Sequence, residues 1–152
     1  MSSRESPLVQ HVRQHQQAFA GLPDYMHQAM LRAYLQTATH QPLSPETLEI
    51  YAAPWIGTTG QAAFYRQIAQ MDQAHTDQVQ EMYGPMTCPV TVLWGAQDTW
   101  IPLHKGQDLA NRIAGGRLRV VPKAGHLLQE DCPEAIIAAL LETCLSDQQA
   151  SA

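Results

Sequence analysis

Two short apolar runs in the second half of the chain constrain its fold more than any other feature. Residues Val90–Trp94 are apolar except for one threonine, which is typical of a strand buried on both faces of a parallel sheet. Residues Leu118–Val121 form a second run, and a helical pattern at His104–Ile113 lies between the two. A further helix is expected from Pro133 to Leu145. This order of strand, helix, strand and helix predicts two parallel strands joined by a right-handed crossover.

An acidic residue and a histidine follow the ends of these two runs. Asp98 comes three residues after Gly95, and His126 comes directly after Gly125. Open α/β sheets place their active sites beyond the carboxyl ends of parallel strands. A carboxylate bonded to an imidazole fixes its tautomer and stabilises the imidazolium, as a general base requires. We interpret Gly95 as permitting a tight exit from the strand, and Gly125 as letting the backbone turn so that His126 points to the cleft.

The chain before residue 85 is predicted to be helical throughout. Apolar residues recur there at helical spacing in five stretches, namely residues 8–20, 23–34, 44–53, 61–71 and 76–82. Ser44 is expected to cap the third of them. We therefore predict a helical region over residues 1–85 and an α/β region over residues 86–152. Two parallel strands alone make a poor sheet, so the α/β region is expected to be one part of a larger fold.

Two motifs carry a resemblance to a known family: G-x-x-D-x-x-x-P over residues 95–102, and G-H-x-x-x-x-D-x-P-E over residues 125–134. Together they resemble the C-terminal part of α/β-hydrolase-fold enzymes, whose catalytic triad is ordered nucleophile, acid, histidine. The match covers residues 88–145. The resemblance implies that Asp98 is the acid of the triad and that His126 is its histidine.

The same resemblance implies an α/β fold, namely a partial α/β-hydrolase with a helical cap, or lid, followed by the strand–helix–strand–helix segment. Residues 8–84 resemble the cap. The implied chemistry is hydrolysis of a small-molecule substrate without a cofactor or a metal. With a serine nucleophile the substrate is an ester or a related acyl or C–C bonded compound. With an aspartate nucleophile, as in haloalkane dehalogenases and epoxide hydrolases, it is a halide or an epoxide.

The sequence contains no nucleophile of the kind that this family uses. The serines, at positions 2, 3, 6, 44, 146 and 151, do not lie between glycines after a strand. Cys88 precedes the strand and is interpreted as a small buried residue. We expect a truncated or split reading frame that is inactive alone, with either a separately encoded N-terminal half or a second copy of itself as partner. The alternative to an enzymatic function is that the chain is a non-catalytic remnant or an interaction module.

Three further residues are candidates for substrate contact. Trp100 follows the acid and is expected either to line the mouth of the pocket or to pack against the cap. Tyr65 and Arg66, on a cap helix, are candidate substrate contacts, although an aromatic residue at helical spacing is more often part of a core.

Other charged and polar residues are given structural interpretations. His11 and His15 lie four residues apart and could share a helix face as metal ligands do, but no third ligand is evident, so we predict no metal site. Asp131 and Glu134 are interpreted as complementing the dipole of the last helix, with no catalytic role.

Composition excludes several functional classes. The net charge is −5 and no basic block occurs, so binding to nucleic acid or to anionic membranes is not expected. The odd count of cysteines (Cys88, Cys132 and Cys144) does not favour a disulfide framework. The first ten residues lack the apolar stretch of a signal peptide, and the longest apolar run, Ala135–Leu141, is too short to span a bilayer. We therefore expect a cytoplasmic protein.

Overall fold

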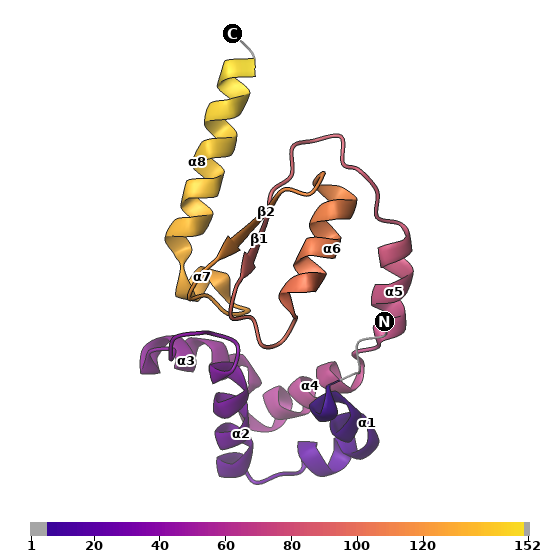
Figure 1. The fold of residues 1–152 in the computed structure, drawn as a ribbon. Helices are drawn as coiled ribbons and strands as arrows, with labels where there is room; N and C mark the ends of the chain where they lie inside the picture. Colours follow the sequence, from indigo (N-terminus) through magenta and orange to yellow (C-terminus); the bar gives the residue numbers. More distant parts are fainter. Residues whose placement is uncertain (1–5, 151–152) are drawn as a thin grey trace. The chain divides into compact units, whose positions relative to one another are not determined.

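The computed structural model describes residues 6–150, with side chains described up to residue 145. The chain divides into two compact units (Figure 1). Unit 1 comprises the described residues up to Leu35 together with Ser44–Met82. Unit 2 comprises Gln36–Leu43 together with the described residues from Tyr83 onward. Gln36–Leu43, a short segment from the helical part of the sequence, therefore belongs with the α/β part.

Unit 1 is helical. Its elements are α1 (Pro7–Ala20), α2 (Asp24–Gln36, whose last residue falls in unit 2), α3 (Pro45–Ala52), the short 3₁₀ helix η1 (Ala53–Trp55), α4 (Gly57–Ala69) and α5 (Gln73–Glu81). The five predicted helices are all present, and Ser44 caps α3 by accepting the Thr47 N–H at 3.1 Å. Helix α5 begins at Gln73 rather than Thr76, because the Asp72 carboxylate accepts the Ala74 N–H and caps the helix there.

The core of unit 1 contains a buried polar group. His27 on α2 is 0% exposed, and its Nε2 lies 2.8 Å from the carbonyl oxygen of Trp55. Because a carbonyl only accepts, Nε2 carries the proton, and Nδ1 accepts the hydroxyl of Tyr65 at 3.0 Å. Phe64 and Phe19 pack their rings around this pair. Both nitrogens of this buried histidine thus have a hydrogen-bond partner.

Unit 2 contains the sheet. Its elements are β1 (Val92–Gly95), α6 (Leu103–Ile113), β2 (Leu118–Val121), α7 (Leu128–Asp131) and α8 (Pro133–Ala150). The strands are parallel, as predicted, and pair in register from Val92 with Leu118 to Gly95 with Val121. The first strand begins at Val92 rather than Val90, because its pairing starts with the bond from Val92 N–H to the carbonyl of Arg117. The short helix α7 was not predicted.

Trp94 and Arg119 point to opposite faces of this sheet, and each meets a different helix. Helix α6 packs on β1 so closely that a Cβ on Gly106 would lie 2.5 Å from the Trp94 ring. Helix α8 is tied to β2 by an ion pair between Arg119 and Glu142. The two strands lie between α8 and α6 in Figure 1.

The expectation that β1 is buried on both faces is wrong. Leu93 and Trp94 are half-buried, and Val120 on β2 is 43% exposed. Four apolar residues of α8 are also exposed by more than half of their surface: Ile137, Leu140, Leu141 and Leu145. Within the described residues β1 pairs with β2 alone, so no further strand or helix is there to cover these side chains.

Among the helices that the structure describes, none is long and apolar enough to cross a lipid bilayer.

Candidate active site

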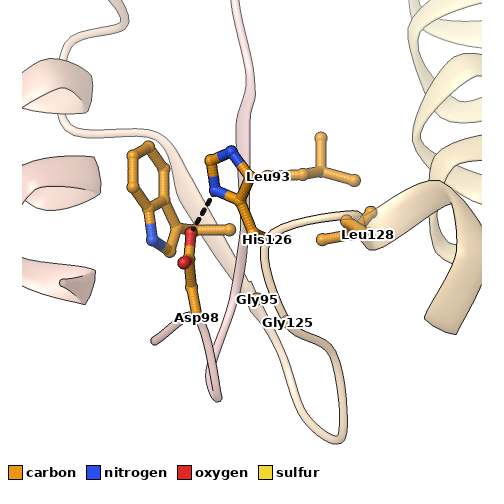
Figure 2. A pocket seen from close by; sticks show the side chains of 7 residues that line it. Leu93, Gly95, Asp98, Gly125, His126 and Leu128 are labelled. Atoms are coloured by element: carbon orange, nitrogen blue, oxygen red, sulfur yellow. Dashed lines mark hydrogen bonds and ion pairs between the residues drawn. The ribbon is translucent and has the colours of Figure 1, made fainter. Parts of the chain in front are cut away.

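Asp98 and His126 lie within hydrogen-bonding distance of each other. Asp98 follows β1 and His126 follows β2, and since the strands are parallel neighbours, their carboxyl ends bring both residues to one edge of the sheet. The Asp98 Oδ2 and His126 Nδ1 atoms are 3.1 Å apart (Figure 2). The hydrogen bond expected from the sequence is therefore present.

The Asp98 carboxylate is fixed by its own turn. Its Oδ1 accepts the backbone N–H groups of Trp100 and Ile101, each at 2.9 Å. Its side chain is 6% exposed. These bonds leave Oδ2 directed at His126.

The bond to Asp98 determines which nitrogen of His126 is basic. Because a carboxylate only accepts, Nδ1 carries the proton, and Nε2 of the neutral ring holds the free electron pair. Figure 2 shows Nε2 on the side of the ring away from Asp98. The His126 side chain is 30% exposed, so Nε2 is accessible to a reacting group.

A pocket of about 150 Å³ adjoins this pair. It is lined by Leu93, Trp94, Gly95, Asp98, Gly125, His126 and Leu128 (Figure 2). Apolar walls and two convergent polar side chains are typical of a site for a small molecule.

Two glycines allow close packing of backbones at the site. A Cβ on Gly95 would lie 2.2 Å from the carbonyl oxygen of Gly125, so the loop that carries His126 passes directly over the end of β1. A Cβ on Gly125 would lie 2.9 Å from the backbone of Ala38 and of His40. Neither glycine has a positive φ. The sequence interpretation attributed both glycines to backbone freedom, and this reason is wrong. Glycine is required here because a Cβ atom would clash with the neighbouring backbone.

Asp131 does more than complement a helix dipole. Its Oδ2 accepts the N–H groups of Gly125 at 2.7 Å and His40 at 2.8 Å, and its Oδ1 accepts that of Gln41 at 2.9 Å. Sequence reasoning missed this role, although Asp131 stands in the second motif.

Trp100 lies beside His126. The ring centroids are 5.0 Å apart at an interplanar angle of 31°, and the indole N–H donates to Thr37 Oγ1 at 2.9 Å. Trp100 is not among the residues that line the pocket. It therefore contacts the candidate base rather than the mouth of the pocket.

Tyr65 and Arg66 both lie in unit 1. Tyr65 is 1% exposed in the core of unit 1, where its hydroxyl is bonded to His27. Burial raises the pKa of Tyr65 above its ordinary value, which keeps the phenol protonated. Arg66 lies exposed on α4 of the same unit. Tyr65 is therefore part of the core of unit 1, and the contact of Arg66 with substrate stays a prediction.

No nucleophile accompanies the pair among the described residues of unit 2. Cys88 is exposed, so the expectation that it is a small buried residue is wrong. Desolvation, followed by the charges of Glu134 and Asp131, raises the pKa of Cys132 and disfavours its thiolate.

In the part of the chain that is described, no three His, Cys, Asp or Glu residues are grouped to hold a metal. The backbone of His15 departs from helical geometry within α1, at φ −132° and ψ 32°, so the helix between His11 and His15 is not regular.

Comparisons with known proteins identify the family and the fold of this chain. An alpha/beta hydrolase fold protein from Burkholderia ambifaria, known from a crystal structure, is 54% identical with a TM-score of 0.88, over 93% of this chain and 53% of that one. BpoC of Mycobacterium tuberculosis, whose name provisionally describes it as a non-heme bromoperoxidase, is 33% identical over 73 residues, 48% of this chain and 28% of BpoC. An esterase from Exiguobacterium antarcticum shares the fold at 16% identity and a TM-score of 0.57, over 89% of this chain and 45% of the esterase.

The chain spans about half the length of the Burkholderia protein. The sequence profile of the Alpha/beta hydrolase family matches residues 5–139, which is most of the chain. The chain therefore belongs to the alpha/beta hydrolase family.

Proposed function

We propose that this chain supplies the acid and the base of an α/β-fold hydrolase that cleaves an ester or a related acyl or C–C bond. The triad consists of a nucleophile from outside these residues, Asp98 and His126. The observation that carries the proposal is the 3.1 Å bond between Asp98 Oδ2 and His126 Nδ1, which leaves Nε2 as the basic atom beside a pocket.

The chemistry follows from this arrangement. Nε2 of His126 accepts the proton of a serine nucleophile as its oxygen attacks the substrate carbonyl. The Asp98 carboxylate stabilises the imidazolium that forms and keeps the ring oriented. His126 then returns the proton to the leaving group and activates the water that releases the acyl product. No cofactor enters these steps.

The nucleophile is proposed to come from a complementary half of the α/β sheet. In the described residues β1 has one free edge, and α8 exposes a row of leucines and an isoleucine. A sheet of two parallel strands is far below the usual size, and its unpaired backbone groups accept a further strand. The complement belongs either to a longer form of this polypeptide or to a separately encoded one. The substrate is a small molecule, and the free thiols fit a cytoplasmic location.

The same pair also fits an aspartate nucleophile. His126 would then activate the water that hydrolyses an alkyl-enzyme ester, and the substrate would be a haloalkane or an epoxide. The identity of the nucleophile alone separates the two reactions.

The experiment is complementation. We would coexpress this chain with the part of the Burkholderia ambifaria protein that it does not cover, and assay p-nitrophenyl acetate, 1-bromobutane and styrene oxide. The chain alone is expected to hydrolyse p-nitrophenyl acetate no faster than its His126→Ala variant, because its described residues supply neither a nucleophile nor an oxyanion hole to work with the base. The complemented pair is expected to turn over one substrate class.

Three outcomes separate the alternatives. Turnover by the complex that is lost with His126→Ala supports the proposal. Turnover that His126→Ala leaves unchanged contradicts the assignment of the base. A stable complex without turnover of any of the three substrates favours an interaction module, and turnover by the chain alone would show that it holds a nucleophile, with Ser44 and Cys88 tested first.

A further inference from the structure

The carboxylate of Asp131 joins three backbone segments that are far apart in the sequence. Its three acceptor bonds, at 2.7 to 2.9 Å, reach the N–H groups of Gly125, His40 and Gln41. His40 and Gln41 belong to the segment Gln36–Leu43, which is part of unit 2. The side chain is half-buried, so these bonds are partly protected from water.

These bonds hold the backbone on both sides of His126. On one side Asp131 accepts the N–H of Gly125, and on the other side the N–H of Leu127 donates to the carbonyl of Ala38 at 2.9 Å. Asp131 in turn fixes the segment that contains Ala38 through His40 and Gln41. His126 therefore stands between two anchored peptide groups, one bonded to Asp131 itself and the other bonded to a segment that Asp131 also holds.

We propose that Asp131 is a positioning residue for His126, which it directs toward Asp98 by clamping the Gly125 loop to the segment Gln36–Leu43. This inference rests on the proposed role of His126 as the catalytic base. Without the carboxylate, three amide N–H groups that now converge on one point lose their common acceptor. The loop then keeps its bond from Leu127 to Ala38 but loses the link through Asp131, so the 3.1 Å bond between His126 and Asp98 loses part of its support.

The chemistry of the clamp requires a carboxylate rather than an amide. A carboxylate has two acceptor oxygens, and both are used here. An asparagine has one acceptor oxygen, and its NH₂ group would face an N–H donor. If the amide oxygen of the Asp131→Asn variant takes the place of Oδ2, the bonds to Gly125 and His40 persist and only the bond to Gln41 is lost. This variant is therefore expected to be partly impaired.

Amide hydrogen exchange measured by NMR on the whole chain tests the clamp directly. Asp131→Ala is expected to speed exchange at Gly125, His40 and Gln41 by about 10- to 100-fold, the factor that corresponds to losing a bond to a charged acceptor. Asp131→Asn is expected to do so at Gln41 alone. Glu134→Gln is the matched control, because it removes the same charge from a neighbouring exposed residue of α8 and should leave the three amides unchanged.

A second measurement connects the clamp to His126. The Nδ1 proton that His126 shares with Asp98 gives a downfield NMR signal, which should weaken or disappear in Asp131→Ala and persist in Glu134→Gln. In the complemented enzyme Asp131→Ala should lower kcat with little change in KM, since the pocket residues remain.

The outcomes are distinct for this inference and for the proposed function. Unchanged exchange at Gly125, or an unchanged Nδ1 signal, in a folded Asp131→Ala chain overturns the clamp. If Asp131→Ala does not fold, the exchange pattern of Asp131→Asn decides. The clamp is overturned if this variant changes the exchange rate by the same factor at Gly125, His40 and Gln41. If the amides respond as expected while the complemented wild type shows no turnover, the clamp stands and the proposed function fails.

Discussion

The indole of Trp100 lies over one side of the His126 imidazole, with the ring centroids 5.0 Å apart. An aromatic ring beside an imidazole stabilises its protonated form through the ring quadrupole, by about 0.5–2 kcal/mol. His126 is proposed to become an imidazolium during turnover. In the complemented enzyme Trp100→Ala is therefore expected to lower kcat by roughly 2- to 30-fold, the factor that this energy gives at room temperature.

The control for Trp100 is Trp100→Phe, which keeps an aromatic ring but loses the indole bond to Thr37. If stacking is the cause, Trp100→Phe retains most of the activity. If the Phe variant is as slow as the Ala variant, the bond to Thr37 is what matters and the stacking argument is wrong.

Asp98→Asn should change the tautomer of His126. An asparagine offers its NH₂ group as readily as its oxygen, so Nδ1 is no longer held in its protonated form. In the complemented enzyme we expect kcat to fall by about 10⁴-fold, as for a triad whose histidine is in the wrong tautomer. Nitrogen-15 NMR of the imidazole reports the tautomer. Asp108→Asn, an exposed position on α6, is the control and should change neither quantity.

Tyr65→Phe should destabilise unit 1. It removes the hydroxyl that donates to His27 Nδ1 and leaves that buried nitrogen without its acceptor bond. An unsatisfied buried polar atom costs about 1–3 kcal/mol of unfolding free energy. Urea denaturation followed by circular dichroism measures the loss. Tyr25→Phe is the control, because Tyr25 is 74% exposed. Equal stability of the two variants would contradict the proposed hydrogen bond.

The burial of Tyr65 also predicts that the free energy of unfolding is sensitive to alkaline pH. Burial raises the pKa of Tyr65 above 10.0, so the unfolded chain releases this proton at a lower pH than the folded chain does. The stabilisation is complete below the unfolded pKa and is lost as pH rises toward the folded pKa. The free energy of unfolding should therefore fall above about pH 10, and less steeply in Tyr65→Phe. Tyr34, whose pKa burial also raises, keeps part of the slope in that variant.

The sequence predicts the contact between Asp98 and His126 well because its signals are local. Asp98 and His126 each follow directly on a strand that its apolar residues reveal, and parallel pairing of the strands brings the two together. The role of Asp131 has no local signal, since the amides of His40 and Gln41 are 91 and 90 positions away. Periodicity likewise places Tyr65 on an apolar helix face but does not show that it meets His27.

Burial is the property that the sequence predicts least well here. The apolar pattern of Val90–Trp94 fits a strand covered on both faces, yet in the described residues β1 pairs with β2 alone, and Leu93 and Trp94 are only half-buried. Cys88 is exposed for a related reason, because residues 85–91 form no regular element. An apolar sequence pattern shows which side chains are suited to burial. How far they are buried depends on which neighbouring strands and helices are present.

The exposed apolar face of α8 predicts that the isolated chain self-associates. Leu140 and Leu141 are 62% and 59% exposed, and the free edge of β1 offers unpaired backbone groups to another strand. Light scattering should therefore report oligomers for the chain alone. Leu140→Glu together with Leu141→Glu should shift the population toward monomers by placing charge on that face. Val79→Glu, at a 48% exposed apolar position of α5, is the control and should leave the oligomers in place. A compact monomer with cooperative unfolding would contradict the prediction, because the apolar face would then need no partner to be stable in water.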